Sequence, residues 1–201
     1  MCAVRALARQ ALRKIRGGVR ALRLPLIGAR AASRTTPSAT SGPPGTPWAG
    51  PPALPPASPV TVYGSLDDYV RVIDAFTLTR PDLGAVRAYN HAMIDVVDSA
   101  VGLADRTLLD VGASPHGFSL ERAMAKGALA YLGVGLGMWE PAEVTHGRGV
   151  GRLLPAYGEA LPLTSESVDA VMSLSTFEHF LDGRAVLREI HRVLRPGEFS
   201  L

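Results

Sequence analysis

The segment from Thr107 to Gly117 constrains the fold of this chain more than any other part of the sequence. It reads Thr-Leu-Leu-Asp-Val-Gly-Ala-Ser-Pro-His-Gly, an apolar run that ends in an acid and is followed by a turn of small residues. The residues that follow, from Phe118 to Met124, read as a helix. Open α/β sheets bind their ligands where a buried strand passes through such a turn into a helix. The segment therefore predicts an α/β domain with a ligand site at the end of this strand.

Strands and helices alternate from this segment to the end of the chain. We predict strands over residues 107–111, 130–134, 151–156 and 168–174, and helices over 118–126 and 184–194. Residues 198–201 would begin a fifth strand, and there the chain stops. This alternation is typical of a Rossmann-like, doubly wound, mostly parallel sheet. We expect the sheet to be incomplete after the fourth or fifth strand and the 201-residue chain to be a fragment.

Two further helices are predicted ahead of the first strand. Ser65 and Asp68 have the spacing of a capping box before an apolar-periodic run that includes Tyr69 and Ile73. A second helix is predicted over about residues 83–101. The α/β domain is thus expected to cover residues 61–201, with a disordered leader and linker over residues 1–60.

The leader and the domain differ in charge. Residues 1–66 contain eight Arg, one Lys and no Asp or Glu, whereas the rest of the chain is acidic. The net charge of +3 therefore reflects the leader, and we predict no nucleic-acid-binding face on the domain. Nine of the 16 prolines fall within residues 35–60, a composition typical of an extended linker.

The role of the leader stays open. Residues 3–24 can form an amphipathic, Arg-rich helix, which fits a mitochondrial transit peptide, a membrane-surface helix or a basic leader without structure. We expect a cytoplasmic protein, with a mitochondrial location as the alternative. No apolar run reaches the roughly 18 residues of a transmembrane helix. Cys2 is the only cysteine, which rules out an intrachain disulfide and fits a reducing compartment.

The chemistry of the turn depends on where its acid lies. Gly112 to Gly117 has the spacing of a G-x-G-x-x-G loop, with Ser114 in the middle glycine position. That spacing alone is compatible with a nicotinamide dinucleotide. Asp110, however, precedes the first glycine by two residues at the strand end, where its charge would repel a pyrophosphate. A cationic ligand, or one that carries an amino acid, tolerates an acid there.

Three later motifs occur in a recognisable order. They are Gly158-Glu-Ala-Leu-Pro-Leu163, Phe177-Glu-His179 and the helix end Leu187-Arg-Glu-Ile-His-Arg-Val-Leu-Arg-Pro-Gly197. Together with the Asp110 loop they resemble the class I S-adenosylmethionine-dependent methyltransferases of the broad small-molecule type, from about Leu108 to Gly197. The resemblance implies S-adenosylmethionine as cofactor and methyl transfer to an O, N or C atom of a small-molecule acceptor.

The resemblance also implies a set of cofactor-binding residues. Asp110, Gly112 and Ser114 match the loop around the methionine and ribose parts of the cofactor. Glu159 and Ala160 match the pair beside the adenine, where the acid accepts from the exocyclic amine. Ser175 matches a position near the transferred methyl, and His179 matches a histidine frequent in the family. The full predicted set is Asp110, Gly112, Ser114, Gly135, Glu159, Ala160 and Ser175.

Two positions depart from the family pattern. Ser114 adds a side chain where the family has a glycine. Gly135 stands where an acid would clasp the ribose hydroxyls, a charge-assisted interaction that contributes about 1.5–3 kcal/mol. Glu140 is a candidate replacement from the next loop. These departures keep open a non-catalytic binding or regulatory module with the same fold, and a nicotinamide-binding Rossmann protein is the third reading.

Other aspects of function are not encoded in a recognisable pattern. No catalytic residue is identified, because the sulfonium is itself a strong electrophile and only some acceptors need a base. The histidines and the cysteine lack metal-ligand spacing, so we predict no metal site. The acceptor and the oligomeric state are not specified by the sequence.

Overall fold

A computed structural model of the chain describes residues 59–136 and 141–200. The predicted leader therefore lies outside the described residues, apart from its last two positions, as do Cys2 and Glu140. Within the described residues, no helix is both long and apolar enough to cross a membrane. The elements, in chain order, are β1 (Thr61–Tyr63), α2 (Leu66–Thr79), α3 (Leu83–Val101), β2 (Thr107–Val111), α4 (Phe118–Ala125), β3 (Ala130–Val134), β4 (Ala142–His146), β5 (Gly149–Leu154), β6 (Val168–Met172), the 3-10 helix η1 (Phe177–His179), α5 (Gly183–Val193) and β7 (Leu194–Ser200).

The strands form one seven-stranded sheet in the order β1-β4-β5-β3-β2-β6-β7. Five neighbouring strands, from β5 to β7, pair in parallel. β4 pairs antiparallel with β5, and β1 pairs parallel with β4 at the edge. The predicted Rossmann-like, mostly parallel sheet is confirmed. The order reverses at β2, which lies between β3 and β6, and this reversal is where ligands bind in such sheets.

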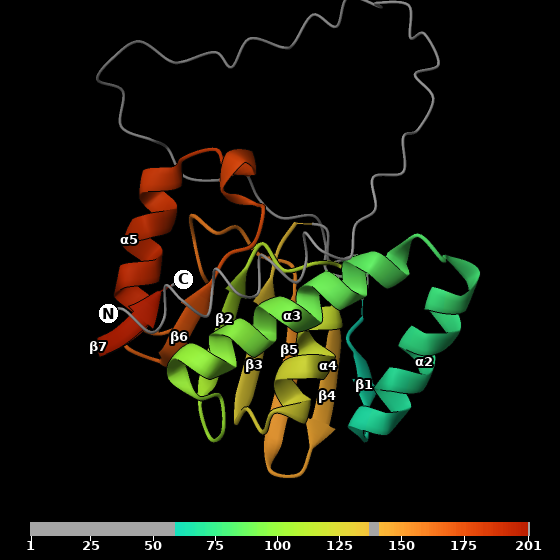
Figure 1. The fold of residues 1–201 in the computed structure, drawn as a ribbon. Coiled ribbons are helices and arrows are strands. Elements are labelled where there is room, and N and C mark those ends of the chain that lie inside the picture. Colours follow the sequence, from blue (N-terminus) through green and yellow to red (C-terminus); the bar gives the residue numbers. More distant parts are fainter. Residues whose placement is uncertain (1–58, 137–140, 201) are drawn as a thin grey trace, which may run out of the picture. The chain divides into compact units, whose positions relative to one another are not determined.

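Helices cover both faces of the sheet, as a doubly wound fold requires (Figure 1). α2, α3 and α4 lie on one face, where Phe118, Leu120 and Met124 of α4 are fully buried. α5 packs on the other face through Val186, Ile190 and Val193. The alternation within β2 explains this sorting, because successive side chains of a strand point to opposite faces. Leu108 packs against the face that carries α2, α3 and α4, whereas Leu109 and Val111 pack against the face that carries α5.

Side-chain caps begin two of the helices, and the first is the predicted cap at Ser65. The Ser65 hydroxyl accepts a hydrogen bond from the Asp68 backbone N–H at 3.1 Å and begins α2. Asp182 accepts from the backbone N–H groups of Arg184 and Ala185 and begins α5. Each cap satisfies donors that the first helical turn leaves without a partner.

An ion cluster holds the three helices of one face together. Arg87 of α3 donates through Nε and Nη2 to both carboxylate oxygens of Glu121 in α4, at 2.8 and 2.9 Å. Its Nη1 donates to Asp74 of α2 at 2.6 Å, and His91 of α3 also contacts Glu121. The Glu121 side chain is only 5% exposed, so its charge depends on these partners.

β1 and β4 were not predicted from the sequence. β1 has three residues, and β4 reads Ala-Glu-Val-Thr-His, with only Ala142 and Val144 buried. β4 joins β5 through a two-residue turn, Gly147-Arg148, in which Gly147 has a φ of +57°. The hairpin moves the start of β5 to Gly149, two residues earlier than predicted.

Candidate functional site

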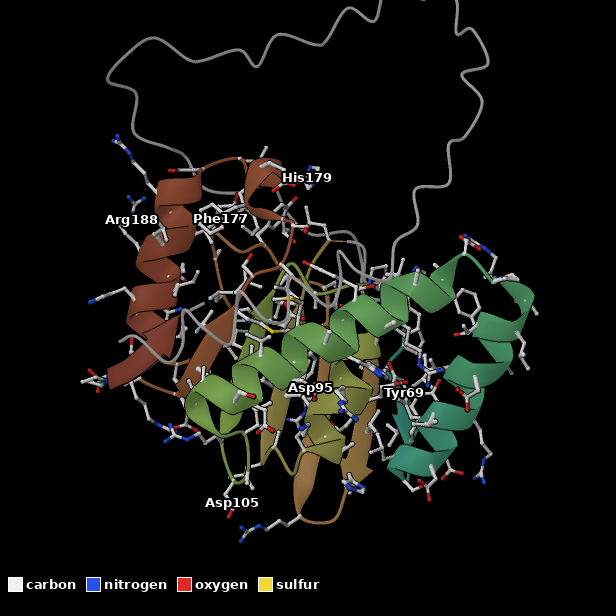
Figure 2. The ribbon with its side chains drawn as sticks, viewed as in Figure 1. Tyr69, Asp95, Asp105, Phe177, His179 and Arg188 are labelled. Atoms are coloured by element: carbon white, nitrogen blue, oxygen red, sulfur yellow. The ribbon has the colours of Figure 1, made fainter. Side chains whose placement is uncertain are left out.

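Four turns meet at the carboxyl edge of the parallel strands, after β2, β3, β5 and β6. Between them lies a cavity of about 230 Å³, which we call the carboxyl-edge cavity. Figure 2 shows η1, with His179 labelled, at the β6 side of this edge. The cavity is lined by Gly112, Ala113, Pro115, Val134, Gly135, Leu136, Ala156, Tyr157, Gly158, Glu159, Thr176, His179, Phe180 and Leu181.

The turn after β2 is locked to the turn after β6. Gly112 has a φ of +85°, a conformation that L side chains rarely adopt, and a Cβ there would overlap the Thr176 side chain. The Thr176 hydroxyl lies 3.2 Å from the Gly112 carbonyl oxygen and 2.7 Å from that of Leu174. A glycine at position 112 therefore allows the two turns to pack against each other at the cavity wall.

Three backbone N–H groups in the turns after β2 and β3 already have partners. Those of Gly112 and Ala113 both donate to the Val134 carbonyl, at 2.8 and 3.0 Å, and that of Gly135 donates to Leu154 at 3.3 Å. No Lys or Arg is among the described residues that line the cavity. A pyrophosphate is normally held by free backbone N–H groups at a helix start, often with cationic side chains. The paired N–H groups of Gly112, Ala113 and Gly135 are therefore not available to a pyrophosphate.

Asp110 lies beneath the turn and is not among the cavity-lining residues. It is 2% exposed and accepts a hydrogen bond from the Tyr131 hydroxyl at 2.6 Å. Burial raises the pKa of Asp110 to about 7, and interactions with Tyr131 and Ser119 oppose the rise. In this structure the Asp110 carboxylate stabilises the join between β2 and β3. The predicted direct contact between Asp110 and a cofactor stays a prediction.

Glu159 lines the cavity and anchors one of its walls. Its Oε1 accepts from the backbone N–H of Leu181 at 2.7 Å and from that of Asp182 at 3.3 Å. The residue is 6% exposed, so these hydrogen bonds are made away from bulk water. The carboxylate thus holds the segment between η1 and α5 against the turn after β5. Its predicted contact with an adenine amine is not tested by this arrangement.

The remaining predicted residues divide between the cavity and its surroundings. Gly135 and His179 line the cavity. Ser114, Ala160 and Ser175 do not, although each lies next to a residue that does. The Ser114 hydroxyl accepts from the His116 N–H at 3.3 Å, so the side chain that departs from the family pattern stabilises its own turn.

Comparison with known proteins identifies the domain. A family model described as a methyltransferase domain matches residues 109–200, and that span contains all four turns. A protein named "Uncharacterized methyltransferase" from Mycobacterium ulcerans is 34% identical over 151 residues, which cover 68% of this chain. The chain contains a class I S-adenosylmethionine-dependent methyltransferase domain.

Other relatives of the methyltransferase domain are similar in extent. A protein of the same name from Mycolicibacterium vanbaalenii is 36% identical over 142 residues, which are 66% of this chain and 54% of that protein. The solved structure of the YcgJ protein from Bacillus subtilis has a TM-score of 0.44 and 20% identity, and the match covers 55% of this chain and 49% of that one. The chain spans about half the length of the curated relatives it matches, 56% in the M. ulcerans case.

Several lining residues of the methyltransferase domain were not predicted. Leu136, Tyr157 and Phe180 give the cavity apolar and aromatic surface, and Phe180 meets Phe177 edge-on with ring centroids 5.2 Å apart. Each of these lining residues lies within a few positions of a predicted site residue. The periodicity of the strands locates their ends, but it does not show which turn residues face inward. The resulting cavity suits a flat ring with few charges.

Proposed function

We propose that this domain transfers a methyl group from S-adenosylmethionine to a small-molecule acceptor, with the cofactor in the carboxyl-edge cavity. The observation that carries the proposal is the bonding of the turns. The N–H groups of Gly112, Ala113 and Gly135 are paired within the protein, and no Lys or Arg is among the described residues that line the cavity. Such a site favours an adenosyl group over a pyrophosphate, which supports a methyltransferase cofactor over a nicotinamide dinucleotide.

The lining residues suggest how the cofactor is divided along the site. The volume of about 230 Å³ is below the roughly 300–1,000 Å³ of typical small-molecule pockets. We assign the enclosed part to the adenosine, between the apolar side chains of Leu136 and Phe180. The methionine part then extends along the wall that Gly112 and Thr176 form where they pack against each other.

The protein contributes mainly position to the proposed reaction. The bound sulfonium supplies an electrophilic methyl group. Gly112, Thr176 and Glu159 fix the turns around it, and Phe180 excludes water from the enclosed part. Alignment of two bound reactants accounts for a large share of the rate in transfers of this kind. Asp110 acts indirectly in this scheme, by holding Tyr131 below the turn.

Calorimetric titration of the full 201-residue chain tests the proposal. We expect S-adenosylmethionine and S-adenosylhomocysteine to bind with micromolar affinity and NAD to bind more weakly. Gly135→Trp should abolish this binding, because position 135 lines the cavity and accepts a Cβ with only a 3.3 Å contact to the Ala113 carbonyl. Leu129→Trp is the matched control, since Leu129 is 41% exposed and precedes β3 at the opposite edge of the sheet.

The possible results separate the three readings of the sequence. Tighter binding of NAD than of S-adenosylmethionine would overturn the proposal. Equal loss of S-adenosylmethionine binding in Gly135→Trp and Leu129→Trp would place the site elsewhere. Binding of S-adenosylmethionine without its consumption in the presence of any methyl acceptor would instead support a non-catalytic module of the same fold.

A further inference from the structure

A second cavity lies between α2 and the β1–β4–β5 side of the sheet. Its volume is about 410 Å³, within the range of small-molecule pockets. Val72, Ile73 and Phe76 of α2 form one side, and Ala142 and Leu153 form part of the other. We call it the α2 cavity. It lies largely outside the span of the methyltransferase family model, because α2 and β1 precede residue 109.

The lining of the α2 cavity is apolar and aromatic. Tyr69, labelled in Figure 2, packs between α2 and the sheet, and its ring meets that of Tyr63 edge-on at 5.1 Å. Phe76 adds a third ring at a partly exposed position. Among the described residues that line this cavity, none is Asp, Glu, Lys or Arg. A charged ligand would therefore lose its hydration without gaining a counter-charge, which is costly.

Two polar side chains of the α2 cavity are held in their neutral forms, His116 and Tyr69. Burial and the nearby Arg80 guanidinium lower the pKa of His116, while Asp82 raises it to a smaller extent. Burial, with the Glu121 carboxylate, raises the pKa of the Tyr69 hydroxyl, which stays protonated. The His116 ring lies 5.5 Å from the rings of Phe76 and of Phe118 and is held between them. A neutral imidazole offers one hydrogen-bond donor and one acceptor.

The two cavities are neighbours. Pro115 lines both of them, and His116 follows it directly on the α2 side. Pro115 belongs to the turn after β2, which Thr176 fixes from the other side through Gly112. A ligand in the α2 cavity that is hydrogen-bonded to His116 therefore lies next to the wall of the carboxyl-edge cavity.

We infer that the α2 cavity binds an uncharged, planar, largely apolar molecule that carries a hydroxyl group, and that this molecule is the methyl acceptor. The rings of Tyr63, Tyr69 and Phe76 contact its flat apolar part, and His116 bonds its hydroxyl. The identification as acceptor rests on the proposed function, whereas the binding itself depends only on the lining of the α2 cavity.

Binding of 2-naphthol to the full chain, followed by methyl NMR and by titration, tests this inference. The naphthol ring should shift the methyl signal of Ile73, which lines the cavity, and leave that of Ile190 on α5 unchanged. 2-Naphthoate has the same ring system with a carboxylate, and we expect it to bind at least about tenfold more weakly. Val72→Trp should weaken 2-naphthol binding at least about tenfold by filling the cavity from its rim.

Leu78→Trp is the matched control for the substitution at Val72. Leu78 lies on α2, is 82% exposed and does not line the cavity, whereas Val72 is 49% exposed and does. Equal effects of the two tryptophans, equal binding of naphthol and naphthoate, or an unshifted Ile73 signal would each overturn the inference. Both variants should bind S-adenosylmethionine as the parent chain does. Naphthol binding without S-adenosylmethionine binding would thus refute the proposed function and leave the ligand class of this cavity standing.

Discussion

Gly135→Asp should increase the affinity of the domain for S-adenosylmethionine. Position 135 directly follows β3, lines the carboxyl-edge cavity and, by the family resemblance, stands where an acid would clasp the ribose. The position is not in the left-handed region of φ. An added Cβ would meet its nearest atom, the Ala113 carbonyl oxygen, at 3.3 Å, so the backbone accepts the side chain after a shift of a few tenths of an ångström.

The size of the gain follows from opposing contributions. Charge-assisted hydrogen bonds to the ribose hydroxyls would contribute about 1.5–3 kcal/mol. Ordering of the new side chain and its approach to the Ala113 carbonyl would cost up to about 1 kcal/mol. The net stabilisation of the complex is then about 1–2 kcal/mol, which is roughly a 5- to 30-fold lower Kd.

Calorimetry on three proteins separates the charge from the shape of the new residue. Gly135→Asn has nearly the same size as Gly135→Asp and no charge, so we expect it to gain less than about threefold. S-Adenosylhomocysteine should show the same gain as S-adenosylmethionine, because the two share the ribose. If Gly135→Asp binds no better than Gly135→Asn, the ribose does not lie at the turn after β3, and the orientation proposed for the cofactor is wrong.

Three further predictions concern charges elsewhere in the domain. Burial raises the pKa of Asp110 from 3.8 to about 7. Between these two pH values only the folded chain holds the proton, so its free energy of unfolding falls as the pH rises. Asp110→Asn removes this fall, so in denaturant unfolding its stability relative to the parent chain should rise from about pH 4 to pH 7, by at most about 4 kcal/mol, and stay level above. If this relative stability does not change with pH, Asp110 is ionised throughout. Arg87→Met leaves the Glu121 carboxylate buried without its main partner, so we expect the free energy of unfolding in denaturant to fall by about 3 kcal/mol. Arg71→Met breaks only an exposed ion pair and should lower it by less than about 1 kcal/mol. Similar losses in the two variants would contradict this prediction. Glu159→Ala should speed amide hydrogen exchange at Leu181 and weaken S-adenosylmethionine binding about tenfold. Glu159→Gln should give effects between those of the parent chain and of Glu159→Ala. Unchanged exchange at Leu181 would rule out the anchoring role of Glu159.

The sequence was sufficient to predict the strands that run through the centre of the sheet. β2 and β6 are almost continuous in apolar residues because helices cover both of their faces, and each begins at the predicted residue. β4 was not predicted because it lacks such an apolar run. Only two of its five side chains are buried, and its pairing with β5 depends on a partner that is adjacent in space and on the conformation of Gly147.

The location of the candidate site could be predicted from the sequence, but only some of the residues that line it could. The order of the motifs locates the turns, and Gly112, Gly135 and Glu159 do line the cavity. Asp110 shows why the rest could not be predicted. In β2 it has the same parity as Leu108, which packs in the same cluster as the buried residues of α4, and Asp110 does not line the cavity. Parity is readable in a sequence, but which face opens on the cavity depends on the packing of helices far along the chain.

The contacts of the two acids near the carboxyl edge limit which side chains can transfer a proton to or from a bound molecule. Glu159 is engaged by backbone N–H groups, and Asp110 is buried against Tyr131. Neither carboxylate is therefore free to move a proton on a bound molecule, and His179, with a side chain 75% exposed, is poorly shielded from water for that task. What the edge does provide is a set of mutually locked turns, because Thr176 ties the first to the last and Glu159 ties the third to the last. A site of this kind can accelerate a reaction by holding two reactants in line, and its rate should depend more on the packing of Gly112 and Thr176 than on any single titratable group.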